Sequence, residues 1–269
     1  MNNRLDKLLD TNKNILTLYL TSGYPDKEIS NDIAQILLKS NIDILEIGIP
    51  FSDPIADGPT IQNTSYKAIN SINEPIIDFT FNTIETLRKI NNEKPIILMS
   101  YLNLIYQYGI ENFAVKAKQN GADAVVIPDL PYEESNSIKN VLDNYNIHLI
   151  YMVTPTSSDK TISEISKNAK GFIYYVSSTG VTGSRETLSD KNFENINKIK
   201  KISKIPILIG FGISNKDHIN QIKPWANGVI IASALINGIN SLFKDNEYSK
   251  EKLNNYINNF VNNLRDPND

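Results

Sequence analysis

The stretch LEIGIPFSDPIADGPTIQ (residues 45–62) places two carboxylates in different surroundings. Glu46 lies inside an apolar, strand-like run, whereas Asp57 follows 11 positions later in a segment rich in Pro and Gly. Apolar surroundings raise the pKa of a carboxyl group toward neutrality, which suits it to giving and taking protons. Two other interpretations of Glu46 stay open: an ion pair with a basic neighbour, or a side chain that faces outward. Asp57, followed by Gly58 and Pro59, could also be a turn residue.

The elements that must position these side chains recur along the chain. Eight runs rich in Ile, Val, Leu and Tyr are nearly continuous in hydrophobicity, as parallel strands covered on both faces are. We expect strands at 15–20, 42–49, 95–101, 123–129, 148–153, 171–178, 205–212 and 228–233. Helical spacing lies between them, for example at 26–40, 110–122 and 157–170, where Ser and Asp could cap the last helix, and 60–91 is long enough for more than one helix.

Eight alternating strand and helix units in 269 residues predict an α/β protein with one domain, residues 1–269. The expected architecture is a (β/α)8 barrel, also called a TIM barrel, with extra helical segments. Residues 2–10 are expected to form an N-terminal extra helix that plugs the barrel. An open doubly wound sheet is the alternative.

Composition restricts the function classes. With 41% hydrophobic and 21% charged residues, the chain is typical of a soluble globular protein with a sizeable core. A net charge of -3 gives no broad field to attract nucleic acid or an anionic membrane, and no apolar run is long enough to span a bilayer. Charges in residues 1–14 interrupt what would be the apolar core of a signal peptide, so we expect a cytoplasmic protein. The absence of cysteine excludes disulfides, iron–sulfur clusters and a thiol nucleophile.

The active site of such a barrel lies at the C-terminal ends of its strands. No lysine ends a predicted strand, which argues against a Schiff-base aldolase. His148 begins the fifth strand and His218 lies in a helical stretch, so we expect packing or surface roles for both and no His-ligated metal. Asp129 follows the fourth strand, where it could cap or brace a loop.

Segments of small residues follow the last three strands: TGVTG (179–183), GFGIS (210–214) and IASALI (231–236). Such residues let backbone N–H groups approach an anion, and a helix that starts there adds its N-terminus. The amides of Gly183, Gly212 and Ser233 could therefore bind a phosphate monoester. Each segment taken singly could also be a turn without a ligand.

Several of these segments together resemble the tryptophan synthase alpha chain family. The similarity is carried by residues 45–62 and, in order, by LTSGYPD (20–26), YLNLIYQYGIENF (101–113), PDLPYEES (128–135), STGVTG (178–183) and GFGIS (210–214). It extends over nearly the whole chain. The resemblance implies a (β/α)8 barrel that cleaves indole-3-glycerol phosphate to indole and glyceraldehyde 3-phosphate.

The resemblance also implies roles for individual residues. Glu46 matches the general acid/base of the family, and Asp57 matches the aspartate that interacts with the indole N–H. Thr182 matches a threonine that meets this aspartate when a loop at 178–190, with Gly180 and Gly183 as pivots, closes. The substrate-binding positions that match are Tyr174, Thr182, Gly183, Gly210, Gly212, Ala232 and Ser233.

A partner follows from the same resemblance. The family works with a beta chain that condenses indole with serine, as an alpha2-beta2 heterotetramer, and pyridoxal phosphate is expected in the beta partner, with no cofactor in this chain. Pro50, Asp53 and Asn103 match positions that face the beta chain, although from the sequence alone they read as turn residues.

Two residues depart from the family pattern, and rival functions stay open. Ser178 stands where many relatives have an arginine, and Ala232 stands where a glycine is common. The nearest rival function is a stand-alone indole-3-glycerol phosphate lyase that releases free indole. A glycosidase would also use two carboxylates, and a catalytically silent scaffold that activates a beta chain is a further alternative.

Overall fold

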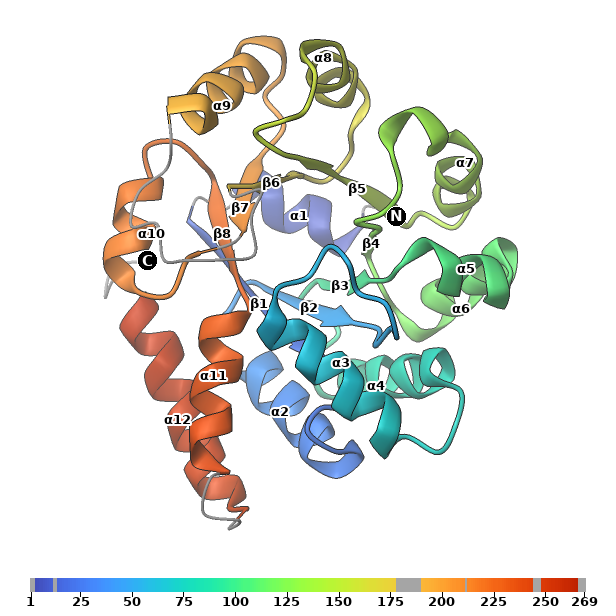
Figure 1. Cartoon of the computed structure of the whole chain (residues 1–269), viewed down its shortest axis with the longest axis vertical. Helices are drawn as coiled ribbons and strands as arrows, with labels where there is room; N and C mark the ends of the chain where they lie inside the picture. The colour runs from blue at the N-terminus through green and yellow to red at the C-terminus, as the bar shows by residue number, and fades with distance from the viewer. Residues whose placement is uncertain (1–2, 12–13, 178–189, 211, 244–247, 266–269) are drawn as a thin grey trace.

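The computed structural model describes residues 3–11, 14–177, 190–210, 212–243 and 248–265. Eight parallel strands pair in chain order and close into a barrel (Figure 1). The strands are β1 (Ile15–Thr21), β2 (Ile44–Gly48), β3 (Ile96–Met99), β4 (Ala124–Val126), β5 (His148–Val153), β6 (Ile173–Val176), β7 (Ile207–Gly210) and β8 (Gly228–Ile231). All eight predicted strands are confirmed, most with narrower bounds, and the open sheet is excluded.

Helices surround the strands (Figure 1). One follows each strand and covers the barrel: α2 (Lys27–Lys39), α4 (Ile76–Ile90), α6 (Ile110–Asn120), α7 (Asn136–Asn144), α8 (Asp159–Asn168), α9 (Asp190–Ile202), α10 (Lys216–Ile222) and α12 (Lys250–Leu264). Additional helices are α1 (Arg4–Thr11), α3 (Pro59–Ser71), α5 (Leu102–Tyr108) and α11 (Ser233–Leu242), and a short 3-10 helix, η1, spans Tyr132–Glu134. The expected extra helical segments are therefore confirmed, including two helices within 60–91. Within the described ranges, no helix is long and apolar enough to cross a membrane.

Local sequence signals set where the helices begin. The Asp26 carboxylate caps α2 by accepting hydrogen bonds from the backbone N–H groups of Glu28 and Ile29. The Ser158 hydroxyl caps α8 by accepting from the Thr161 N–H group. Each cap satisfies backbone donors that the first helical turn leaves without a partner, so the predicted serine cap of α8 is confirmed, and the Asp26 cap of α2 is an additional finding.

Alternation along the strands separates an outer from an inner face. Leu45 and Ile47 of β2 belong to the large cluster between strands and helices, whereas Ile44 belongs to the cluster inside the barrel. Glu46 shares the inward face with Ile44. The register places Glu46 beside Tyr19 of β1 and Ile97 of β3. Because strands in a closed barrel cannot slip without exposing their outer apolar row, this register fixes Glu46 inside.

Helix α1 closes the N-terminal end of the barrel, as predicted for residues 2–10 (Figure 1). Its Leu5 is fully buried in the interior cluster. Asp123 anchors the helix, because its carboxylate accepts from Arg4 Nη1 at 3.0 Å and from Arg88 Nη2 of α4 at 2.7 Å. His148 Nε2 lies 2.8 Å from Asp6 Oδ1. The contacts of Arg4 with Asp123 and of Asp6 with His148 tie α1 to the N-terminal ends of β4 and β5.

We expect Leu5→Ala to lower the free energy of unfolding by about 2–5 kcal/mol, because it leaves a cavity in the barrel interior. Urea unfolding followed by circular dichroism measures the change. Ile202→Ala, at a position on α9 that is 41% exposed, serves as the control and should cost much less. Equal losses in the two variants would contradict the plug role of α1.

Candidate active site

Glu46 is buried inside the barrel. It is 1% exposed, and the described residues supply no hydrogen-bond partner for its Oε1 atom. Burial raises the pKa of Glu46 to about 8, and the negative charge of Asp57 acts in the same direction. The structure thus contradicts the outward orientation, and within its described part it gives Glu46 no ion pair. A carboxylic acid that is protonated at neutral pH can donate a proton and, once ionised, accept one.

Asp57 lies on the loop after β2, just before the residue that caps α3. It is 7% exposed, and its Oδ2 atom accepts a hydrogen bond of 3.0 Å from the Tyr101 hydroxyl. Burial raises the pKa of Asp57 to about 6, and the hydrogen bond from Tyr101 opposes this rise. The backbone of Asp57 also takes part in the turn, since its N–H donates to the Pro54 carbonyl at 3.0 Å. Asp57 is therefore both a turn residue and a buried carboxylate.

Two tyrosines complete the polar lining around the carboxylates. Tyr19 of β1 and Tyr174 of β6 are buried, which raises the pKa of both hydroxyls well above the ordinary value, and the charges of Asp57 and Glu46 add to the rise. Both hydroxyls therefore stay protonated. A Cβ at position 48 would lie 2.0 Å from Tyr19 Oη, and one at position 210 would lie 2.5 Å from Tyr174 Cε1. Gly48 and Gly210 thus leave room for the two rings.

The predicted phosphate-binding positions lie on neighbouring segments after β7 and β8. These strands pair, with Gly210 opposite Ile230. Gly212 has a φ of 78°, a backbone conformation that favours glycine. Ser233 begins α11, whose N-cap residue Ala232 has no side chain that could accept from the first N–H groups.

The departure at position 232 is tolerated by the backbone. Ala232 has a φ of -124°, outside the positive range that favours glycine. Thr182 and Gly183, with the rest of the 178–189 segment, lie outside the described residues. Phosphate binding stays a prediction.

The positions predicted to face a partner differ in exposure. Asp53, on the loop after β2, and Asn103, on α5, are exposed, whereas Pro50 is buried within this chain. Ile55 and Tyr106, close to them in sequence, are 80% and 51% exposed. A partner surface at this end of the barrel stays a prediction.

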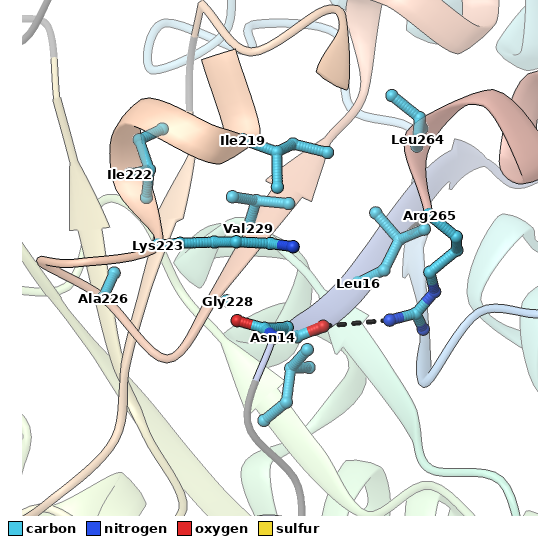
Figure 2. A pocket seen from close by; sticks show the side chains of 11 residues that line it. Asn14, Leu16, Ile219, Ile222, Lys223, Ala226, Gly228, Val229, Leu264 and Arg265 are labelled. Atoms are coloured by element: carbon cyan, nitrogen blue, oxygen red, sulfur yellow. Dashed lines mark hydrogen bonds between the residues drawn. The ribbon is translucent and has the colours of Figure 1, made fainter. Parts of the chain in front are cut away.

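Two of the hollows in the described part of the chain lie near opposite ends of the strands. Figure 2 shows the one between β1, β8, α10 and α12, next to the N-terminal strand ends, where Arg265 Nη1 donates to the Asn14 carbonyl at 2.9 Å. Its volume of about 20 Å³ holds at most a water or two. A cavity of about 360 Å³ lies between the segments after β4 and β5, within the size range of ligand pockets. It is not lined by Glu46 or Asp57 themselves.

The structure also places Asp129 and the two histidines. The Asp129 carboxylate accepts from the Leu102 N–H at 2.9 Å, so it braces the start of α5 as predicted. His148 is buried against α1, and His218 lies on α10, away from both carboxylates. In the described ranges, no three His, Cys, Asp or Glu side chains gather as a metal site would require.

Tyr19 and Tyr101 were not among the predicted site residues. Both lie at or just after the C-terminal end of a strand, where a barrel places its active site. Tyr19 also lies on the same, inward face of β1 as Thr17 and Thr21, which are two positions away on either side. Position in the strand was therefore the available signal, but the sequence does not show that either hydroxyl lies near a carboxylate.

Fold and site together define a (β/α)8-barrel protein with two buried carboxyl groups, Glu46 and Asp57, on its second strand and on the loop that follows. Residues 5–265 match the family model of the tryptophan synthase alpha chain. The chain is 36% identical to the tryptophan synthase alpha chain of Methanocaldococcus jannaschii over 252 residues, which covers 93% of this chain and 88% of the relative. The protein belongs to the tryptophan synthase alpha chain family.

Two further relatives match this chain over nearly its full length. A tryptophan synthase alpha chain from Thermoanaerobacter is 38% identical over 269 residues, covering 98% of this chain and 99% of its own. The crystal structure of tryptophan synthase subunit alpha from Legionella pneumophila superposes with a TM-score of 0.85 at 33% identity, covering 98% and 99% of the two chains. The barrel architecture is thus shared with solved alpha subunits.

We expect the buried Glu46 carboxyl group to make stability fall as the pH rises. Its pKa is about 8 in the folded chain against 4.5 ordinarily, so between these values the unfolded chain releases a proton that the folded chain retains. The folded state therefore loses several kcal/mol relative to the unfolded state across this range. Glu46→Gln should lack this loss, so its advantage over the parent should grow from pH 5 to pH 8 in urea unfolding.

Glu85→Gln is the control for this measurement, because the Glu85 side chain is 55% exposed in its pair with Lys89 on α4. The free energy of unfolding of this variant should change with pH as that of the parent does. A constant difference between Glu46→Gln and the parent across the range would show that Glu46 ionises as readily in the folded chain as in the unfolded one.

Proposed function

We propose that this chain is the alpha subunit of tryptophan synthase, a lyase that cleaves indole-3-glycerol phosphate to indole and glyceraldehyde 3-phosphate. Membership of the family supports the reaction. The observation that carries the assignment to this site is the buried Glu46 carboxyl group, whose Oε1 has no hydrogen-bond partner among the described residues and whose pKa is raised further by the charge of Asp57.

The reaction needs somewhere for an electron pair to go when the carbon–carbon bond breaks. In the proposed mechanism, protonated Glu46 delivers its proton to C3 of the indole ring, which gives the indolenine form. Asp57, ionised at neutral pH, stabilises the positive charge that develops on N1. Removal of the proton from the adjacent side-chain hydroxyl then forms the aldehyde, and the electron pair of the broken bond restores the aromatic indole.

The two pKa shifts fit these roles. Because burial raises the pKa of Glu46 to about 8, this group holds its proton at pH 7. Asp57, with a pKa of about 6, is mostly ionised at the same pH. Ionised Glu46, formed by the first step, is then a stronger base than an ordinary carboxylate and can take up the hydroxyl proton.

The substrate phosphate is assigned to the segments after the last three strands. Gly212 and Ser233 offer backbone N–H groups on adjacent segments, and the first turn of α11 favours an anion electrostatically. Tyr174 is assigned to the neighbourhood of the reacting side chain. Thr182, Gly183, Gly210 and Ala232 are assigned to the same substrate site on family resemblance.

The partner is assigned as a tryptophan synthase beta chain, in an alpha2-beta2 heterotetramer that passes indole to pyridoxal phosphate chemistry in the beta chain. The exposed Asp53 and Asn103, with Ile55 and Tyr106 near them, support a docking face at the C-terminal end of the barrel. Pro50 would support this face from beneath, since it is buried within the chain. The cytoplasm stays the predicted compartment.

We expect Glu46→Gln to reduce indole release from indole-3-glycerol phosphate by about 10² to 10⁴, the usual contribution of general acid–base catalysis. The measurement compares the parent chain, Glu46→Gln and the exposed control Glu85→Gln, each alone and with a beta chain. The control should retain full activity. Undiminished release by Glu46→Gln would contradict its acid/base role.

The same experiment separates the rival functions. Slow release that rises sharply with the beta chain supports the alpha subunit, whereas fast release by the chain alone supports a stand-alone lyase. No release by the parent under either condition, with a beta chain that is still activated, would support a silent scaffold.

We expect Ile55→Arg to weaken association with the beta chain, because it places a charge on the proposed docking face. Sedimentation velocity should then show less of the four-chain complex than with the parent. Ile202→Arg, on α9 on the far side of the barrel, is the matched control and should associate normally (Figure 1). Equal association of the two variants would move the docking face elsewhere.

A further inference from the structure

Tyr101 joins the loop after β2 to the segment after β3. It lies between β3 and α5, and it is 3% exposed. Its hydroxyl donates to Asp57 Oδ2 at 3.0 Å and accepts from the Ala56 N–H at 3.0 Å. Its ring stacks on Phe51, with 5.0 Å between the ring centroids. All three contacts are made to the loop that carries Asp57.

The segment after β3 is itself braced from the other side. The Leu102 N–H, one residue beyond Tyr101, donates to Asp129 Oδ1 at 2.9 Å. Asp129 belongs to the segment after β4. The hydrogen bond between Leu102 and Asp129 therefore fixes the position of Tyr101 relative to the strand ends. Tyr101 in turn fixes the loop after β2 through its own contacts.

Apart from Tyr101, the ionisable groups around Asp57 do not favour its charge. Glu46 faces it from β2, Tyr19 from β1 and Tyr174 from β6, and each of these is acidic or neutral. Asp129 adds a further negative charge near Tyr101. Within the described residues, the hydrogen bond to the Asp57 carboxylate comes from Tyr101. It opposes the effect of burial on the pKa of Asp57.

We propose that Tyr101 is a positioning residue that keeps the Asp57 carboxylate ionised and aimed into the barrel mouth. This inference rests on the proposed function, in which Asp57 acts as a carboxylate. On this proposal, Tyr101 on the segment after β3 controls the ionisation of Asp57 on the loop after β2. Tyr101 acts through Asp57 and need not touch the substrate.

The test is the pH profile of kcat/KM for indole release by Tyr101→Phe, which keeps the ring and its stack on Phe51 but removes the hydroxyl. A hydrogen bond to a charged group favours ionisation, so its loss should raise the acid limb of the profile by about one to two pH units. Near pH 6, where Asp57 of the parent is half ionised, activity should fall roughly five- to fifty-fold, and it should recover as the pH rises.

Tyr108→Phe is the matched control. Tyr108 lies on α5, and its hydroxyl donates to a carboxylate as well, at 2.6 Å from Asp78 Oδ1, but away from the site. Its profile should coincide with that of the parent. In an Asp57→Asn background, Tyr101→Phe should have little further effect, because the group through which it acts is gone.

Two outcomes would overturn the proposal while the proposed function stands. One is a loss of rate in Tyr101→Phe that is the same at every pH, as a purely structural role would give, and the other is an unchanged profile. If Tyr101→Phe does not fold, Phe51→Leu provides a second variant that disturbs the stack and leaves the hydroxyl. It should shift the acid limb upward by a smaller amount, and an unshifted limb would count against the proposal.

Carboxyl carbon NMR of Asp57 separates this proposal from the proposed function, since it needs no substrate. The Asp57→Asn variant assigns the signal. If the parent releases no indole, the proposed function fails, but the titration midpoint of Asp57 should still rise in Tyr101→Phe and stay unchanged in Tyr108→Phe. An unmoved midpoint would overturn the role of Tyr101.

Discussion

The burial of one carboxyl group, that of Glu46, is the constraint on which the site depends. Taking an ionised carboxylate out of water without a partner is so costly that the group holds its proton instead. Glu46 stays buried because β2 is fixed from both sides, by β1 and β3, and its outer row of leucine and isoleucine packs against the helices. The free energy that maintains this acid therefore comes from the barrel as a whole.

A second buried carboxylate shows that this treatment of Glu46 is specific. Asp123, at the opposite end of the barrel, is 2% exposed, but it accepts hydrogen bonds from two arginine side chains and from the Ile96 N–H at 2.9 Å. The same fold thus satisfies one carboxylate completely and leaves an oxygen of the other without a described partner. This contrast follows the usual division of a barrel, with stabilising contacts at the N-terminal end and chemistry at the C-terminal end.

The sequence predicted the strands and singled out Glu46 because these depend on local patterns, whereas Asp57 read equally as a turn residue and was assigned to the site through the family resemblance. Parallel strands covered on both faces read as apolar runs, and a glutamate inside such a run stands out. The contacts of Tyr101 with Asp57 and of Arg88 with Asp123 could not be predicted, because they join residues 44 and 35 positions apart. Such contacts depend on strand register and loop shape, which the sequence pattern does not specify. The phosphate-binding segments were predicted only because three segments of small residues follow three successive strands, since each segment alone could be a turn. Residues 178–189, which include the first of these segments, lie outside the described structure.

Two neighbouring buried carboxyl groups can have different roles only if their surroundings separate their pKa values. Glu46 lies on a strand inside the barrel, and its Oε1 receives no hydrogen bond from the described residues, whereas Asp57 lies on a loop that brings it to the Tyr101 hydroxyl. Between pH values of about 6 and 8 the pair therefore holds one proton, on Glu46, and one negative charge, on Asp57. The proposed mechanism, in which a ring carbon is protonated while a cation on the ring nitrogen is stabilised, requires this charge state. Strand and loop thus provide the acid and the anion separately.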